Sequence, residues 1–139
     1  MDNVELNIGL RTKAGPNEAA DILSRALLAQ SLLASNLALG RVFSRVHNVR
    51  YTGPDGLDAI EPTLVVRCRV GRGFRLPMVV YDIAQRLQQD CIAVMRFPDD
   101  GSFVDGDLIG PGASEWGPFN PDFFVRFDAV ADATERGAA

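Results

Sequence analysis

The sequence predicts an α+β domain of the ferredoxin-like type, a plait in which two helices cover one face of an antiparallel sheet. Segments with strand and helix periodicity follow one another in the order β-α-β-β-α-β up to residue 97, which is the split-βαβ arrangement. Only two segments have a clear helical pattern, so a three-layer α/β fold with helices on both faces is disfavoured.

The first strand is predicted at residues 4–12, where apolar and polar side chains alternate as in a half-buried strand. Gly15 and Pro16 break this pattern. Asn17 is then a suitable N-cap for a helix that runs to residue 33 or 34.

Residues 41–52 and 63–70 predict the second and third strands, separated by turn-forming residues at 53–56. Pro77 suits the first turn of the second helix, and residues 91–97 predict the fourth strand. We expect an antiparallel sheet with the first strand between the third and the fourth. The side chains predicted to lie beneath the helices are Leu64, Val66 and Cys68.

Residues 98–127 are predicted to form an appendage to the plait core at 4–97, within a single domain at 1–127. A hairpin turn at residues 99–101 begins it, and a stretch rich in proline, glycine and aromatic residues follows. The Ala-rich residues 128–139 are predicted to fray.

Cysteine use and hydropathy predict a cytoplasmic protein. Cys68 and Cys91 lie in apolar runs and are interpreted as buried thiols of a reducing compartment. No apolar run approaches the roughly 20 residues that cross a bilayer, and the first residues do not resemble a signal peptide.

Charge is distributed unevenly along the chain. Residues 1–89 carry 11 basic and 8 acidic side chains, whereas residues 90–139 carry 3 basic and 10 acidic ones. This asymmetry is consistent with a basic face and an acidic face, although solubility alone also explains it.

The loop at 71–77 is the one candidate ligand site in the sequence. It joins a strand to a helix, and Arg72, Gly73 and Arg75 offer guanidinium groups and backbone donors to an anion such as phosphate. The full glycine-rich signatures of phosphate loops are missing, so a tight loop with solvated arginines is the competing interpretation.

No catalytic residue, cofactor or metal ligand set is assigned. His47 is the single histidine, Cys91 follows an acidic residue that opposes thiolate formation, and the aspartates at 99–107 lack an EF-hand pattern. Nucleic-acid binding is disfavoured because the first strand lacks the outward aromatics of RNA-binding plaits.

The aromatic stretch is the candidate interaction feature. Such a density of aromatic area either covers the bare face of its own sheet or anchors a protein interface, and a homodimer is one form of that interface. The residues assigned to this surface are Trp116, Phe119, Phe123, Phe124, Asp105 and Asp107.

Together these observations favour a non-catalytic protein-interaction module, such as a small regulator or inhibitor from a bacterium or its mobile elements. The first alternative is a small enzyme or sensor that binds an anionic ligand at residues 71–77. The second is an acidic mimic of nucleic acid.

Overall fold

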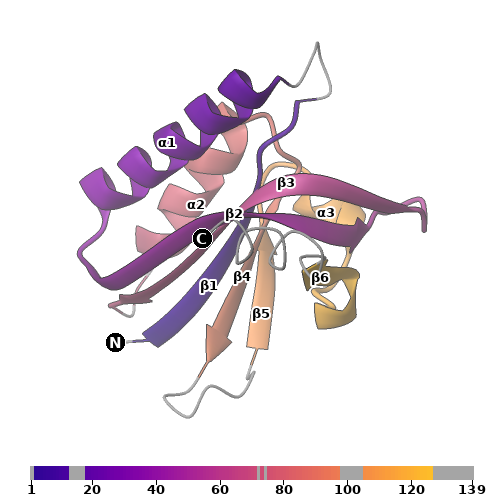
Figure 1. Cartoon of the computed structure of the whole chain (residues 1–139). Helices are drawn as coiled ribbons and strands as arrows, with labels where there is room; N and C mark the ends of the chain where they lie inside the picture. The colour runs from indigo at the N-terminus through magenta and orange to yellow at the C-terminus, as the bar shows by residue number, and fades with distance from the viewer. Residues whose placement is uncertain (1, 13–17, 72, 74, 98–104, 127–139) are drawn as a thin grey trace, which may run out of the picture.

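The computed structural model describes residues 2–12, 18–71, 73, 75–97 and 105–126. Figure 1 shows two long helices lying side by side on one face of a twisted sheet, with short elements at the end of the chain packed near one end of the strands. The elements are β1 (Asp2–Gly9), α1 (Ala19–Asn36), β2 (Leu39–Thr52), β3 (Asp58–Val70), α2 (Arg75–Arg86), β4 (Ile92–Phe97), β5 (Asp105–Ile109), α3 (Ala113–Trp116), a 3-10 turn (Pro121–Phe123) and β6 (Phe124–Arg126).

The sheet confirms the predicted ferredoxin-like plait. Its six strands lie in the order β5-β4-β1-β3-β2-β6, and all neighbours are antiparallel. β1 therefore lies between β3 and β4, as the sequence predicts. The two additional strands, β5 and β6, extend the four-stranded plait on both sides.

The hydrophobic core lies between the sheet and the two long helices. Leu64, Val66 and Cys68 are buried there, so the predicted register of β3 is correct. They pack beside alternate apolar residues of β1 and β4 and beneath Val80 and Ile83 of α2. The opposite face of the sheet carries the polar positions of β1, including Glu5 and Asn7.

The β2–β3 hairpin is longer than predicted, because β3 begins at Asp58 rather than at residue 63. Pro62 has no N–H to donate and normally interrupts a strand. Here its carbonyl accepts a hydrogen bond from the Leu10 N–H at 3.1 Å, so residue 62 directs its backbone groups towards β1. The ladder with β2 does not need the missing N–H, and the hairpin continues through the proline.

Other boundaries differ by a few residues. β1 ends at Gly9 rather than 12, and α1 continues to Asn36 with Glu18 as its N-cap. Asn17, the hairpin turn at 99–101 and the tail at 128–139 lie outside the described residues. Among the residues that are described, no helix combines the length and the hydrophobicity needed to cross a membrane.

Candidate functional site

A cavity of about 260 Å³ lies at one end of the sheet, on the face away from the long helices, where the appendage packs against the strands. We call it the sheet-end pocket. Its lining residues are Asn7, Gly9, Arg11, Thr12, Val49, Tyr51, Ala59, Ile60, Glu61, Thr63, Gln88, Gln89, Asp90, Cys91, Trp116 and Phe124.

Three strands form the floor of this pocket. The register of the hairpin places Val49 opposite Glu61 and Tyr51 opposite Ala59, so these side chains share one face. Gly9 of β1 completes the floor, and a Cβ atom there would lie only 2.5 Å from Glu61 Oε1 and would also clash with the Gln89 amide. Glycine therefore lets the Glu61 and Gln89 side chains approach the backbone of β1.

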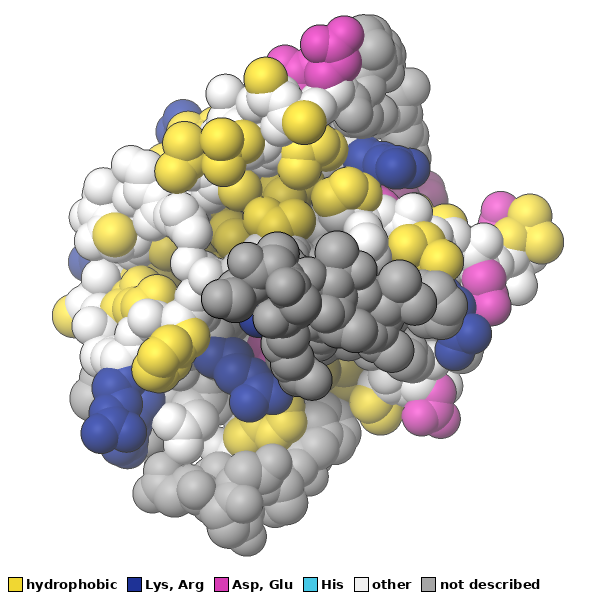
Figure 2. All heavy atoms as spheres, in the orientation of Figure 1, with side chains coloured by type: hydrophobic (Ala, Val, Ile, Leu, Met, Phe, Trp, Pro, Cys, Tyr) yellow, Lys and Arg dark blue, Asp and Glu magenta, His cyan; other side chains and the backbone are white. Residues whose placement is uncertain are grey.

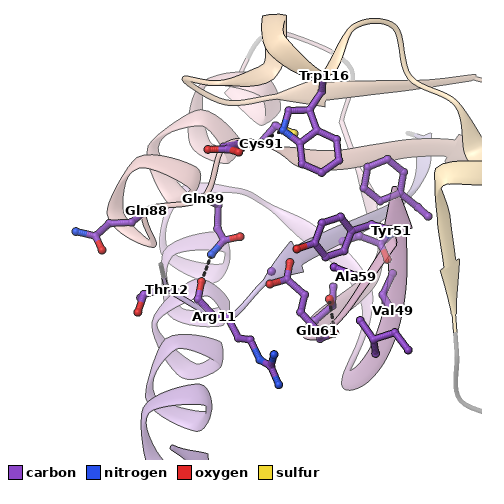
Figure 3. Close-up of a pocket in the computed structure, with 16 residues that line it drawn as sticks. Arg11, Thr12, Val49, Tyr51, Ala59, Glu61, Gln88, Gln89, Cys91 and Trp116 are labelled. Carbon is purple, nitrogen blue, oxygen red and sulfur yellow. Dashed lines mark hydrogen bonds between the residues drawn. The ribbon is translucent and has the colours of Figure 1, made fainter. Parts of the chain in front are cut away.

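The segment after α2 forms one rim of the pocket. Gln88 adopts a left-handed conformation with a φ of 56°, and the Gln89 N–H donates to the Ala84 carbonyl at 2.8 Å. This ending reverses the chain and is uncommon for a residue other than glycine. It brings Gln89 to the residues that follow β1, where its side-chain amide donates to the Arg11 carbonyl (Figure 3). This hydrogen bond links the segment after α2 to the segment after β1.

Aromatic rings form the opposite wall. The Trp116 ring centroid lies 5.7 Å from that of Tyr51 and 6.1 Å from that of Phe124, and Phe119 stacks on Phe124 at 5.8 Å. The Trp116 indole N–H donates to Asp90 Oδ2 at 3.3 Å, which fixes the ring against the rim. Figure 3 shows Trp116 and Tyr51 on the same side of the cavity, with the Glu61 carboxyl group pointing towards Tyr51.

Close backbone packing holds the appendage in place beside the pocket. The Gly112 N–H donates to the Asp90 carbonyl at 2.8 Å. A Cβ atom at Gly110 would lie 2.6 Å from the Cα atom of Cys91, and one at Gly106 would lie 2.6 Å from the Phe119 ring. These glycines are required because larger residues would push the aromatic wall away from the strands.

Glu61 is the electrostatic centre of the pocket. Burial raises its pKa from 4.5 to about 7, against the opposing influence of the Arg11 and Arg25 guanidinium groups. Burial, followed by the charge of Glu61, also raises the pKa of Tyr51. Near neutral pH the Glu61 carboxyl group is therefore divided between its two protonation states, and it can either exchange a proton or hold a cation.

Neither cysteine is a candidate nucleophile. Cys68 is buried as predicted, and burial raises its pKa to about 11. Cys91 is only half-buried and lines the pocket, but burial and the neighbouring Asp90 raise its pKa to about 12. A thiol with such a pKa stays protonated at neutral pH and does not attack a substrate.

The predicted anion loop lies at the other end of the sheet. β1 pairs Asp2 with Val70 beside this loop and Gly9 with Thr63 at the pocket, and its eight residues span roughly 24 Å. Arg72 lies outside the described residues, Gly73 has a φ of 142°, and the Arg75 guanidinium donates to the Asn36 carbonyl at 3.1 Å. Anion binding at this loop stays a prediction.

The residues assigned to a protein interface lie in two places. Asp105 and Asp107 form ion pairs with Arg96, whose Nη1 atom lies 3.5 and 2.8 Å from their carboxylate oxygens. A basic group of the same domain therefore offsets part of their negative charge. Trp116, Phe119 and Phe124 form the aromatic wall described above, and the side chain of Phe123 lies outside the description. Their contact with another protein stays a prediction.

Sequence reasoning missed the polar residues of the pocket, Glu61, Gln89 and Asp90. Glu61 does leave a signal, because it is a lone carboxylate between apolar residues at 59–66. The partners that surround it come from segments distant in the sequence, and the sequence pattern does not bring them together.

Comparison with known proteins supplies a fold-level relationship. No family model matches the chain, and no curated protein does. Among solved structures, a phage SAM lyase in its apo state is similar, with 13% identity, a TM-score of 0.57, and coverage of 78% of this chain and 87% of that one. A phage SAM lyase in complex with S-methyl-5'-thioadenosine is similar at 12% identity and a TM-score of 0.50, with coverage of 78% and 88%. At such identities the likeness shows a shared fold.

These matches correct the functional expectation. The sequence favours a non-catalytic interaction module, but both similar structures are enzymes by name, and they cover most of the chain. The expectation was wrong because it rested on the absence of a recognisable catalytic motif. Of the aromatic residues that the sequence assigns either to the cover of the sheet or to an interface, Trp116 and Phe124 line a pocket.

Proposed function

We propose that this chain is an enzyme that binds S-adenosylmethionine (SAM) in the sheet-end pocket and cleaves one of its carbon–sulfur bonds. The observation that carries the proposal is the combination of an aromatic wall with a buried carboxyl group, Glu61, whose pKa lies near neutrality. The shared fold with phage SAM lyases supports the choice of substrate.

The chemistry of the pocket suits the two parts of SAM. Its sulfonium centre is a cation, and aromatic faces and an ionised carboxylate both attract cations. Its adenine ring can stack on Trp116 or Tyr51, as nucleobases do on aromatic side chains. The cavity of about 260 Å³ lies just below the usual range for small-ligand pockets, so part of the ligand would extend through the mouth of the pocket.

The proposed reaction breaks the bond between the sulfonium sulfur and the four-carbon amino acid chain. The bonding electron pair stays on sulfur, which leaves as the neutral thioether S-methyl-5'-thioadenosine. The carbon fragment is completed either by loss of a proton to a base, for which Glu61 is positioned, or by ring closure with its own carboxylate. The identity of the second product, an unsaturated amino acid or a lactone, shows which of the two routes operates.

The same observations favour an enzyme with its site at the sheet-end pocket over an enzyme or sensor with its site at residues 71–77. The charged side chains that influence the pKa of Glu61 come from three separate segments, namely Arg11 after β1, Arg25 of α1 and Asp90 before β4. This convergence on one ionisable group is typical of active sites. The 71–77 loop has no comparable grouping among its described residues.

Incubation of the chain with SAM tests the proposal. Chromatography of the products should show S-methyl-5'-thioadenosine accumulating in proportion to protein concentration, well above the slow decomposition of SAM in buffer alone. The Glu61→Gln variant provides the matched control for contaminating enzymes. SAM that decays equally fast with and without the chain would contradict the proposal.

A further inference from the structure

Arg25 is the single basic residue of α1, and its side chain bonds to the protein backbone. Figure 2 shows hydrophobic side chains gathered over this helix. Arg25 is half-buried. Its guanidinium group donates to three backbone carbonyls, those of Leu10 at 2.6 Å, Arg11 at 3.5 Å and Leu87. The side chain therefore joins α1 to the segment after β1 and to the segment after α2.

The Leu87 carbonyl lies at the end of α2. The N–H groups of Gln88 and Gln89 turn back to carbonyl oxygens of the last helical turn, at 3.1 and 2.8 Å, as in a Schellman motif. The Leu87 carbonyl accepts from the Arg25 guanidinium group instead. A cation is favourable at this end of a helix, where the dipole is negative. Arg25 thus caps the turn that contains the left-handed residue Gln88.

The Leu10 carbonyl connects Arg25 to the strand that carries Glu61. Leu10 directly follows β1, and its N–H donates to the Pro62 carbonyl at 3.1 Å. Pro62 is the residue after Glu61 in β3. Leu10 therefore receives the Arg25 guanidinium through its carbonyl and holds the backbone beside Glu61 through its N–H.

The two segments that Arg25 joins both line the sheet-end pocket. Arg11 comes from the segment after β1, and Gln89 and Asp90 come from the segment after α2. The Gln89 side-chain amide and the Arg25 guanidinium both donate to the Arg11 carbonyl. Asp90 in turn accepts from the Trp116 indole at 3.3 Å. A displacement of this turn would therefore reach the aromatic wall.

Arg25 also acts on Glu61 through its charge, although it is not among the lining residues. Burial raises the pKa of Glu61, the charges of Arg11 and Arg25 oppose this rise, and Asp90 adds to it. Burial lowers the pKa of Arg25, and the charge of Glu61 opposes that change, so the interaction is mutual. The charged and titratable groups around Glu61 are Arg11, Arg25, Tyr51, Asp90 and Cys91.

We propose that Arg25 is a positioning residue of the sheet-end pocket, which fixes the segments after β1 and α2 against each other and supplies a positive charge to the surroundings of Glu61. Its effect on catalysis rests on the proposed function, whereas its effects on Gln89 and Glu61 do not. A link that serves only the stability of the fold would lower the melting temperature when it is removed, without changing the ionisation of Glu61.

Two substitutions separate the charge of Arg25 from its hydrogen bonds. Arg25→Met removes both. Arg25→Lys keeps the charge, but one ammonium group cannot occupy the positions of Nε and Nη2, which bond to different carbonyls. Carboxyl-carbon NMR titration should give Glu61 a pKa that is higher in Arg25→Met than in Arg25→Lys by roughly half a unit or more. The signal is assigned by its loss in Glu61→Gln.

The Gln89 side-chain amide reports the position of the turn. Its NMR signals should shift, and its protons should exchange faster with water, in both Arg25 variants, because the turn loses its cap. Arg86→Met is the matched control. Arg86 forms an ion pair at 2.9 Å with Asp82 on the surface of the same helix, so its loss should leave both the Glu61 titration and the Gln89 signals unchanged.

Kinetics extend the test to the proposed reaction. At about pH 9 Glu61 is ionised in every variant, so a remaining loss of kcat/KM for SAM reports position and not charge. We expect a loss of about tenfold or more in both Arg25 variants, since small displacements of positioning groups cost that much.

Either of two NMR results would overturn the inference. One is the same Glu61 pKa in Arg25→Met and Arg25→Lys, and the other is Gln89 amide signals that match those of the unmodified chain in both variants. If Arg25→Met does not fold, the Gln89 signals of Arg25→Lys decide alone. A chain that leaves SAM intact would contradict the proposed function, and the two NMR readouts would still decide the role of Arg25.

Discussion

Replacing Glu61 with glutamine is expected to lower kcat/KM for SAM cleavage by about a hundredfold or more. The substitution keeps the shape of the side chain but removes both its charge and its ability to accept a proton. Loss of a positioned base costs about 10²–10⁴ in rate, and loss of one partner of a buried charge pair costs about 2–5 kcal/mol. Steady-state kinetics of thioether release would measure the effect.

The pH profile should follow the same group. If the ionised form of Glu61 is the active one, kcat/KM of the unmodified chain should rise with pH through about 7, the pKa of that carboxyl group. The residual activity of Glu61→Gln should lack this rise. A variant with Glu115, which is exposed beside Trp116 on α3, changed to glutamine should retain both the rate and the profile.

Raising the pH should lower the stability of the fold while it raises the activity. Because the folded-state pKa of Glu61 is raised above 4.5, its protonated form favours folding, and that contribution is lost as pH rises from about 4.5 through about 7. The loss is at most about 3 kcal/mol. Glu61→Gln should therefore melt at a higher temperature than the unmodified chain at pH 8, with the difference shrinking towards pH 4.5.

A Glu61→Gln variant with the same kcat/KM as the unmodified chain would contradict a role for Glu61 in the reaction.

Replacing Trp116 with alanine should weaken the binding of S-methyl-5'-thioadenosine by about tenfold to a hundredfold. Stacking of a base on an aromatic side chain contributes about 1–3 kcal/mol, and Trp116 is the largest ring of the pocket wall. Titration calorimetry would measure the dissociation constant without requiring turnover.

Conservative and remote variants separate stacking from general damage. Trp116→Phe keeps an aromatic face, so it should retain most of the affinity although it loses the hydrogen bond to Asp90. Tyr81→Ala on the exposed side of α2 removes aromatic area far from the pocket lining and should leave affinity unchanged. Equal affinity in Trp116→Ala and the unmodified chain would exclude a stacking role for this ring.

The fold could be predicted because its signals are local. The alternation at residues 4–10 and 63–70 sets which side chains face the helices, and the structure buries Leu6 and Leu64 as that pattern requires. The extra length of the β2–β3 hairpin could not be predicted in the same way. Pro62 interrupts the local pattern, and only its pairing with β1 shows why it is tolerated.

The site could not be predicted because its parts are distant in the sequence. Glu61, Gln89 and Trp116 lie on three segments that meet only after the sheet forms and the appendage packs against it. The turn that brings Gln89 to β1 has a left-handed residue at Gln88, and because that residue is not glycine, the sequence does not indicate the turn. The sequence pattern singles out the aromatic residues, but it does not show that Trp116 packs beside Tyr51, because the two are 65 positions apart in the chain.

A crystal structure of the chain with S-methyl-5'-thioadenosine tests the central claim most directly. The proposal places the nucleoside in the sheet-end pocket, with its adenine against the Trp116 or Tyr51 ring and its sulfur on the side of Glu61. A nucleoside bound at the 71–77 loop or elsewhere, with the sheet-end pocket empty, would contradict it.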